Sequence, residues 1–165
     1  MLSELSNKFP ELREKLLSPF LIDVNPNYVT LVAFLCAIGS GYFYYKDMSV
    51  AVTVWVRLNA LFDVGDCQIA EVFGKAGRFG DFLDHTFDRL SDVVILLGLT
   101  LSSFIPERVG FFTIIAVLLV SYMGTQSQAI TRRRLYTGIL GRSDRMVILI
   151  VIGILHSYYS LALVV

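Results

Sequence analysis

The stretch DVGDCQIAEVFGKAGRFGDFLDHTFD, residues 63–88, carries four aspartates inside two segments that are otherwise apolar enough to enter a lipid bilayer. The four are Asp63, Asp66, Asp84 and Asp88. An ionised aspartate near the middle of a membrane costs about 3 kcal/mol, so four would cost on the order of 10 kcal/mol, comparable to the stability of a whole domain. A positive partner must therefore offset these charges.

Helical geometry narrows the identity of that partner. Residues three or four apart share one face of a helix, so the aspartates form two pairs that each face one way. Two such faces on neighbouring helices would gather carboxylate oxygens, which are hard ligands typical of Mg²⁺, Mn²⁺ or Ca²⁺ sites. Gly80 lies four residues before Asp84 and leaves room for a ligand or another helix. We therefore predict a metal site, with a buried interhelical ion pair as the alternative.

The spacing of these residues resembles the signature of the CDP-alcohol phosphotransferases. That signature reads D-x-x-D-G-x-x-A-R, then about eight residues, then G-x-x-x-D-x-x-x-D. Two positions depart from it, because Cys67 stands in place of glycine and Glu71 in place of arginine. A second stretch, Pro26-Asn27-x-x-Thr30, is similar to the start of this family's first membrane helix. The signature positions here are Asp63, Asp66, Cys67, Ala70, Glu71, Gly80, Asp84 and Asp88.

The resemblance implies a phosphoryl transfer in which a hydroxyl attacks the phosphorus of a CDP-linked lipid and CMP leaves. It implies a site with Mg²⁺ or Mn²⁺, and two ions suit four carboxylates better than one. Asp88 would also be the catalytic base toward the acceptor hydroxyl. The metal ligands would be Asp63, Asp66, Asp84 and Asp88, and the CDP end of the donor would lie against Asp63, Asp66, Cys67, Ala70, Gly80 and Asp84.

Composition indicates an all-α integral membrane protein. The chain has 165 residues, 55% of them hydrophobic, and a mean hydropathy of +0.66, which is too apolar for a soluble domain of this size. Residues 1–23 have helically spaced apolar side chains among charges and predict an interfacial amphipathic helix, and residues 24–165 predict one transmembrane domain. Five spans are expected, and since the resembled family has six, the last helix is expected to be missing. The predicted spans are residues 28–45, 49–73, 79–104, 111–129 and 146–165.

The distribution of Lys and Arg predicts the orientation in the membrane. With the amino terminus in the cytoplasm, ten of these residues fall on the cytoplasmic side and two, Lys46 and Arg108, on the other. The aspartates then open toward the cytoplasm, where water-soluble substrates arrive. Relatives in the resembled family are commonly dimers, so a homodimer is expected, with a lipid bilayer as partner and no nucleic acid.

A basic segment over residues 131–145 is the candidate site for the acceptor. The planar fork of arginine suits phosphate oxygens, although an anchor for anionic headgroups explains the first three arginines about as well. By resemblance, basic residues here bind the phosphate of a phosphorylated polyol, so inositol phosphate or glycerol phosphate is favoured over serine. The arginines are Arg132, Arg133, Arg134, Arg142 and Arg145.

Three further polar residues receive structural interpretations. Arg57 and Asp92 extend in the same direction from the aspartate pairs, so we predict an ion pair between them. His85 lies about 100° around the helix from Asp84, and we favour no ligand role for it.

Two other functions are compatible with the sequence. A cation or proton transporter would also keep carboxylates within the membrane. Alternatively, Cys67 and Glu71 could mark a catalytically weakened member of the resembled family, because they add bulk and negative charge where an anionic donor would bind.

Overall fold

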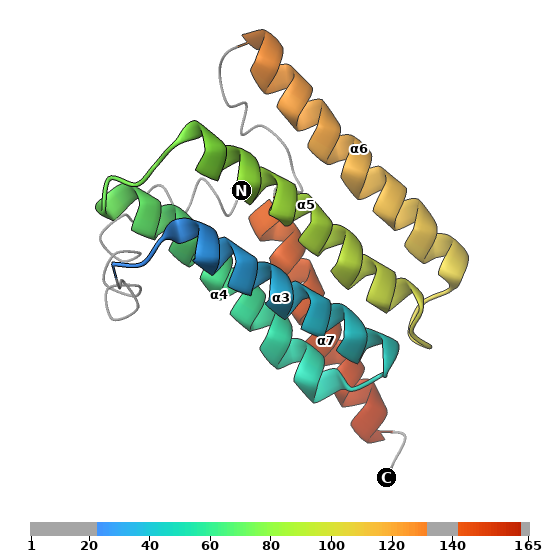
Figure 1. The fold of residues 1–165 in the computed structure, drawn as a ribbon. Coiled ribbons are helices and arrows are strands. Elements are labelled where there is room, and N and C mark those ends of the chain that lie inside the picture. The colour runs from blue at the N-terminus through green and yellow to red at the C-terminus, as the bar shows by residue number, and fades with distance from the viewer. Residues whose placement is uncertain (1–22, 132–141, 163–165) are drawn as a thin grey trace.

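The computed structural model describes residues 23–131 and 142–162, and within these ranges the chain forms α-helices and no strand (Figure 1). The predicted all-α fold is therefore confirmed, and each of the five predicted spans overlaps one helix. The predicted amphipathic helix falls, apart from residue 23, outside the described residues. The helices are α3 (Pro26–Tyr45), α4 (Ser49–Val72), α5 (Arg78–Thr100), α6 (Glu107–Thr131) and α7 (Arg142–Ala162).

The central helix of the arrangement is α3, which packs against both α4 and α5. On the outside, α7 packs on α4 and α6 packs along α5 (Figure 1). A short turn reverses the chain between α3 and α4, so these two helices are antiparallel (Figure 1). The start of α3, the end of α4 and the start of α5 consequently meet at one end of the bundle.

Glycines allow α3 and α5 to touch backbone to backbone. A Cβ atom added to Gly98 would overlap the backbone of Gly41, and one added to Gly41 would lie 2.5 Å from the carbonyl oxygen of Val94. Near the other end of the pair, Gly80 faces Asn27. The two helices therefore run parallel, in the close contact through small residues that is common between membrane helices.

Polar contacts between helices accompany a buried apolar core. The hydroxyl of Tyr44 donates to the carbonyl of Leu149 at 2.9 Å, and the amide nitrogen of Asn59 donates to the carbonyl of Ala33 at 2.7 Å. Such bonds satisfy side-chain donors away from water. The buried core cluster consists of Ala37, Tyr44, Val52, Val56, Ile95, Leu96, Leu99, Met146 and Leu149.

The exposed surface of α6 is apolar, which indicates that this helix contacts lipid. Only 6% of its apolar stretch, Glu107–Ser127, is buried, and the ring of Phe112 is 74% exposed. An apolar surface of this extent is unusual on a soluble protein and suits contact with lipid. By length and composition, α3 and α6 could each cross a membrane. Further exposed apolar side chains on α6 are Val109, Phe111, Ile115, Leu118, Leu119, Val120, Tyr122 and Met123.

Candidate active site

A polar cavity of about 340 Å³ lies where α3 begins, α4 ends and α5 begins. It contains two of the predicted metal ligands, Asp66 from α4 and Asp84 from α5, and it also contains the predicted donor-binding residues Cys67, Ala70 and Gly80. The described residues that line it are Pro26, Asn27, Thr30, Asp66, Cys67, Ala70, Glu71, Lys75, Ala76, Gly77, Gly80, Asp81 and Asp84.

Asp66 is oriented by neutral donors from two helices. Its side chain is buried, with 2% of the residue exposed. One carboxylate oxygen accepts the hydroxyl of Thr30 at 2.5 Å and the other accepts the backbone N–H of Cys67 at 2.6 Å. These bonds fix the direction of the carboxylate but bring no positive charge to it.

The carboxylate of Asp84 has even fewer hydrogen-bond donors around it than that of Asp66. Its Oδ2 atom accepts only the thiol of Cys67, at 3.6 Å, and its Oδ1 atom is buried with no hydrogen-bond partner among the described residues. A buried carboxylate oxygen without a donor is costly. A hard cation bound between Asp66 and Asp84 would remove that cost, so the residues present fit a divalent metal ion.

Two groups of side chains have ligand atoms within 4.8 Å of one another: Asp66 with Cys67 and Asp84, and Asp84 with His85 and Asp88. Asp84 is common to both groups, so it connects the α4 carboxylate to Asp88 one turn further along α5. Asp63, which is half-buried on α4, belongs to neither group. The structure thus brings two of the other three predicted aspartates, Asp66 and Asp88, close to Asp84.

Sequence reasoning missed two residues of this site, Thr30 and His85. The sequence predicts for Thr30 only a place at the start of a helix, yet its hydroxyl reaches Asp66. The angle between His85 and Asp84 argues against a ligand role, but the long side chain of His85 brings a ring nitrogen near Asp84 and Asp88. The fixed spacing from Pro26 to Thr30, and the position of His85 between two aspartates, were the available signals.

Gly80 leaves space in the cavity without being required by helix packing. A Cβ atom added there would lie 3.6 Å from the Oδ1 atom of Asn27, an ordinary contact distance. A methyl group would therefore fit against α3 and would occupy part of the cavity instead.

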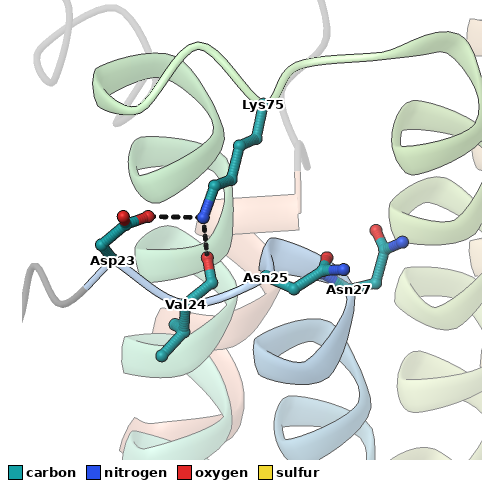
Figure 2. Close-up of polar contacts among 5 residues, drawn as sticks. All are labelled: Asp23, Val24, Asn25, Asn27 and Lys75. Atoms are coloured by element: carbon teal, nitrogen blue, oxygen red, sulfur yellow. Dashed lines mark hydrogen bonds and ion pairs between the residues drawn. The ribbon is translucent and has the colours of Figure 1, made fainter.

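Lys75 lies on the cavity wall in the connection between α4 and α5 (Figure 2). Its ammonium group donates to the carboxylate of Asp23 at 2.5 Å and to the carbonyl of Val24 at 3.2 Å. Among the described lining residues it is the single cation, whereas four are acidic.

The predicted pairing of Arg57 with Asp92 is wrong. Asp92, 2% exposed, instead binds the guanidinium of Arg145 at 2.5 Å, and Arg57 is exposed on α4. The reason is that α7, whose position could not be read from the sequence, brings Arg145 to α5. Asp92 is four residues after Asp88, about 6 Å along the helix, so Arg145 lies near the site.

The other predicted phosphate ligands are described less fully. Arg132, Arg133 and Arg134 lie outside the described residues. Arg142 begins α7, but its side chain is likewise outside the described part. Of the five arginines, the structure therefore describes only the side chain of Arg145.

Comparison with known proteins gives three consistent findings. Residues 23–165 match the family described as CDP-alcohol phosphatidyltransferase. Over 82% of this chain and 72% of the relative, the sequence is 30% identical to archaetidylinositol phosphate synthase of Pyrococcus horikoshii. Over 87% of this chain and 74% of the relative, it is 29% identical to the protein of the same name from Methanothermobacter thermautotrophicus.

The fold is also similar to that of a solved protein. The phosphatidylinositol phosphate synthase of Mycobacterium tuberculosis, whose crystal structure has CDP-DAG bound, matches with a TM-score of 0.67 and 23% identity. The match covers 86% of this chain and 72% of that one. At this identity the likeness establishes the shared helical fold.

Proposed function

This chain belongs to the CDP-alcohol phosphatidyltransferase family, and from that premise we propose that its acceptor is an inositol phosphate-type polyol. As a member, it is a membrane-embedded transferase of phospholipid biosynthesis that uses a CDP-linked lipid, releases CMP and depends on divalent metal. The names of the archaeal relatives support the acceptor class, with glycerol phosphate as the second choice. The observation that carries the proposal is the meeting of Asp66 and Asp84 in one cavity.

We assign the metal ions to the aspartates. Asp66 and Asp84, with Asp63 and Asp88 one turn away on either side, would hold two ions of Mg²⁺ or Mn²⁺. When bound, such ions neutralise charge on the pyrophosphate and on the departing CMP. Thr30 supports this assignment, because its hydrogen bond aims the Asp66 carboxylate into the cavity.

Asp88 is assigned as the base toward the acceptor. The acceptor hydroxyl oxygen forms a bond to the phosphorus on the lipid side of the pyrophosphate, its proton passes to Asp88, and the bond from that phosphorus to the bridging oxygen breaks. Asp88 suits this role because it lies one helical turn beyond Asp84, and the two carboxylates have oxygen atoms within 4.8 Å of each other.

The phosphate of the acceptor is assigned to the arginines of the basic segment. Arg145 is supported by its ion pair with Asp92, which lies one helical turn after Asp88 and so holds the guanidinium near the site. Arg132, Arg133, Arg134 and Arg142 are assigned by sequence position alone. Cys67, Ala70 and Gly80 would contact the CDP end of the donor.

The wider arrangement in the membrane is also proposed. Residues 24–165 would form a transmembrane domain with five spans, preceded by an interfacial helix at residues 1–23. The excess of Lys and Arg on the site's side supports a site facing the cytoplasm. The exposed apolar face of α6 is compatible with lipid and with a homodimer.

The deciding experiment uses the protein in lipid nanodiscs with a CDP-linked lipid and a panel of inositol phosphate, glycerol phosphate, inositol and serine. We expect Mg²⁺-dependent CMP release that is fastest with inositol phosphate, and loss of release when Asp63, Asp66, Asp84 or Asp88 is changed to Asn. Asp47→Asn, the same chemical change at the opposite end of α3, is the control and should leave turnover unchanged. Fastest release with serine would overturn the acceptor assignment.

The transporter alternative is tested with the same protein in liposomes. A cation or proton transporter would move ions across the liposome membrane without consuming CDP-lipid. We expect CDP-lipid consumption and no ion flux above that of empty liposomes.

A further inference from the structure

The acidic character of the cavity raises a problem for a CDP-linked donor. Its described lining includes Asp66, Glu71, Asp81 and Asp84, and the pyrophosphate of the donor is itself an anion. Divalent ions would offset Asp66 and Asp84. Glu71, however, stands where the family signature has arginine, so a fixed cation is lost from that position and a negative charge replaces it.

Lys75 lies four residues after Glu71, beyond the end of α4, and lines the same cavity. It also lines an adjoining cavity of about 350 Å³ with Asn25, Asn27 and Gly80, so it stands where the two cavities meet. In Figure 2 its side chain extends from the α4–α5 connection toward the start of α3.

The backbone at Lys75 is fixed by the way α4 ends. Gly74 adopts a left-handed conformation, with φ of 63°. Its N–H donates to the carbonyl of Glu71 at 3.4 Å, and the N–H of Lys75 donates to the carbonyl of Ala70 at 2.9 Å. This pair of bonds is the Schellman ending of a helix, which reverses the chain at a defined angle. The direction of Lys75 therefore follows from the end of α4.

The ammonium group of Lys75 is held in position by two hydrogen bonds and keeps a third donor. Asp23 and Val24 accept two hydrogen bonds from it, and an ammonium has three donors. The side chain is 37% exposed, so the remaining donor is accessible from the cavity mouth. Asp23 belongs to the segment before α3 and is 68% exposed. Its ion pair with Lys75 can therefore be replaced by one with a stronger anion.

We propose that Lys75 binds the pyrophosphate of the CDP-linked donor and supplies the positive charge that Glu71 does not. Asp23 and the carbonyl of Val24 orient the lysine in the absence of the donor. This inference rests on the proposed function, since it assigns the cavity beside Asp66 and Asp84 to the donor.

The test compares CDP with cytidine as ligands of the full chain in nanodiscs with Mg²⁺. Cytidine lacks the phosphates, so only CDP should depend on Lys75. We expect Lys75→Met to weaken CDP binding roughly 10-fold, with a matching rise in the KM for CDP-lipid and little change in kcat, while cytidine binding changes less than about two-fold. Lys75→Arg should retain CDP affinity within about three-fold.

Two variants separate charge from structure. Adding Glu71→Arg to Lys75→Met should restore CDP affinity, because it returns a cation to the same cavity from the last turn of α4. Lys46→Met is the matched control, since Lys46 lies at the far end of α3 against the ring of Tyr45. It should change neither ligand.

Each result bears on the proposal. Unchanged CDP binding in Lys75→Met, or an equal loss for CDP and cytidine, would overturn the role of Lys75 while wild-type CMP release keeps the proposed function intact. If the wild-type protein neither binds CDP nor releases CMP, the proposed function and this inference both fall.

Discussion

Asp84 and Asp92 lie two turns apart on α5, yet their carboxylates meet opposite surroundings. Asp92 is paired with the guanidinium of Arg145 at 2.5 Å. Among the described residues, Asp84 has only the thiol of Cys67 at 3.6 Å and no ion-pair partner. Each of the two aspartates has one buried oxygen without a hydrogen-bond donor there, so the cation is what separates them. Among the described residues, the chain supplies a cation for Asp92 and none for Asp84, which suits a bound metal ion at Asp84.

This difference separates two uses of a buried carboxylate. A charge paired within the protein contributes to the fold, and its partner is costly to remove. A charge without a protein cation instead costs stability until a ligand binds, which is a feature of functional sites. Asp92 should therefore behave as a structural residue and Asp84 as a binding residue, and the two should respond differently to substitution.

The largest effect is expected for Asp84→Asn. CMP release should fall on the order of 1,000-fold because a metal-binding and transition-state-stabilising group is lost. Stability without metal should not decrease, since an uncompensated carboxylate becomes a neutral amide. Turnover and the Tm in detergent, with and without Mg²⁺, measure both.

Magnesium itself provides the control for that variant. It should raise the Tm of the wild-type protein and of Asp47→Asn by binding the folded state, but not the Tm of Asp84→Asn. A magnesium-dependent rise that persists in Asp84→Asn would mean that the two carboxylates do not differ in the way described.

The next largest effect is expected for the ion pair between Asp92 and Arg145. Arg145→Met removes the ion-pair partner of the buried Asp92 and should lower the free energy of unfolding by about 3–5 kcal/mol. The double variant with Asp92→Asn should recover most of that loss. Chemical unfolding in detergent is the measurement.

Arg57→Met gives the matched comparison, because Arg57 was the partner that the sequence suggested for Asp92. Arg57 is exposed, so the change should be about 0.5 kcal/mol or less. A larger loss in Arg57→Met than in Arg145→Met would favour the sequence-based pairing after all.

The contrast between the two carboxylates also marks how far the sequence alone can predict this molecule. The helices were predictable because long apolar segments are bounded by turns such as Lys46-Asp47 and Pro106-Glu107. The convergence of Asp66 and Asp84 was predictable because spacing along each helix defines a face, and one short connection makes α4 and α5 neighbours in sequence.

Contacts between distant segments were not predictable in the same way. Thr30 reaches Asp66 across 36 residues and Arg145 reaches Asp92 across 53, and both depend on how α3 and α7 pack. That packing is decided by local close approaches such as Gly41 on Gly98, which a single sequence does not reveal. Spacing within a helix can be read from the local sequence, whereas the choice of ion-pair partner depends on tertiary packing.

A smaller effect is expected for Thr30→Val, which removes the hydroxyl that orients Asp66. Magnesium affinity should fall about 10- to 100-fold, the usual cost of losing a hydrogen bond to a metal ligand. Thr53→Val is the control, because the hydroxyl of Thr53 bonds only a carbonyl of its own helix among the described contacts. Titration of the Tm with Mg²⁺ compares the two, and equal affinities would mean that Thr30 does not orient a metal ligand.

The smallest effect is expected at Cys67, the neighbour that Asp84 has in place of a cation. Cys67→Gly returns the residue of the family signature and opens space beside Asp84, so the KM for CDP-lipid should fall about three-fold, a change below about 1 kcal/mol. Glycine within a helix should also cost about 1 kcal/mol of stability, whereas Cys67→Ala keeps the helix propensity and separates the two effects. A thiol carries no positive charge, so neither variant should weaken Mg²⁺ binding. A loss of Mg²⁺ affinity beyond about 10-fold in both would instead make the thiol a metal ligand.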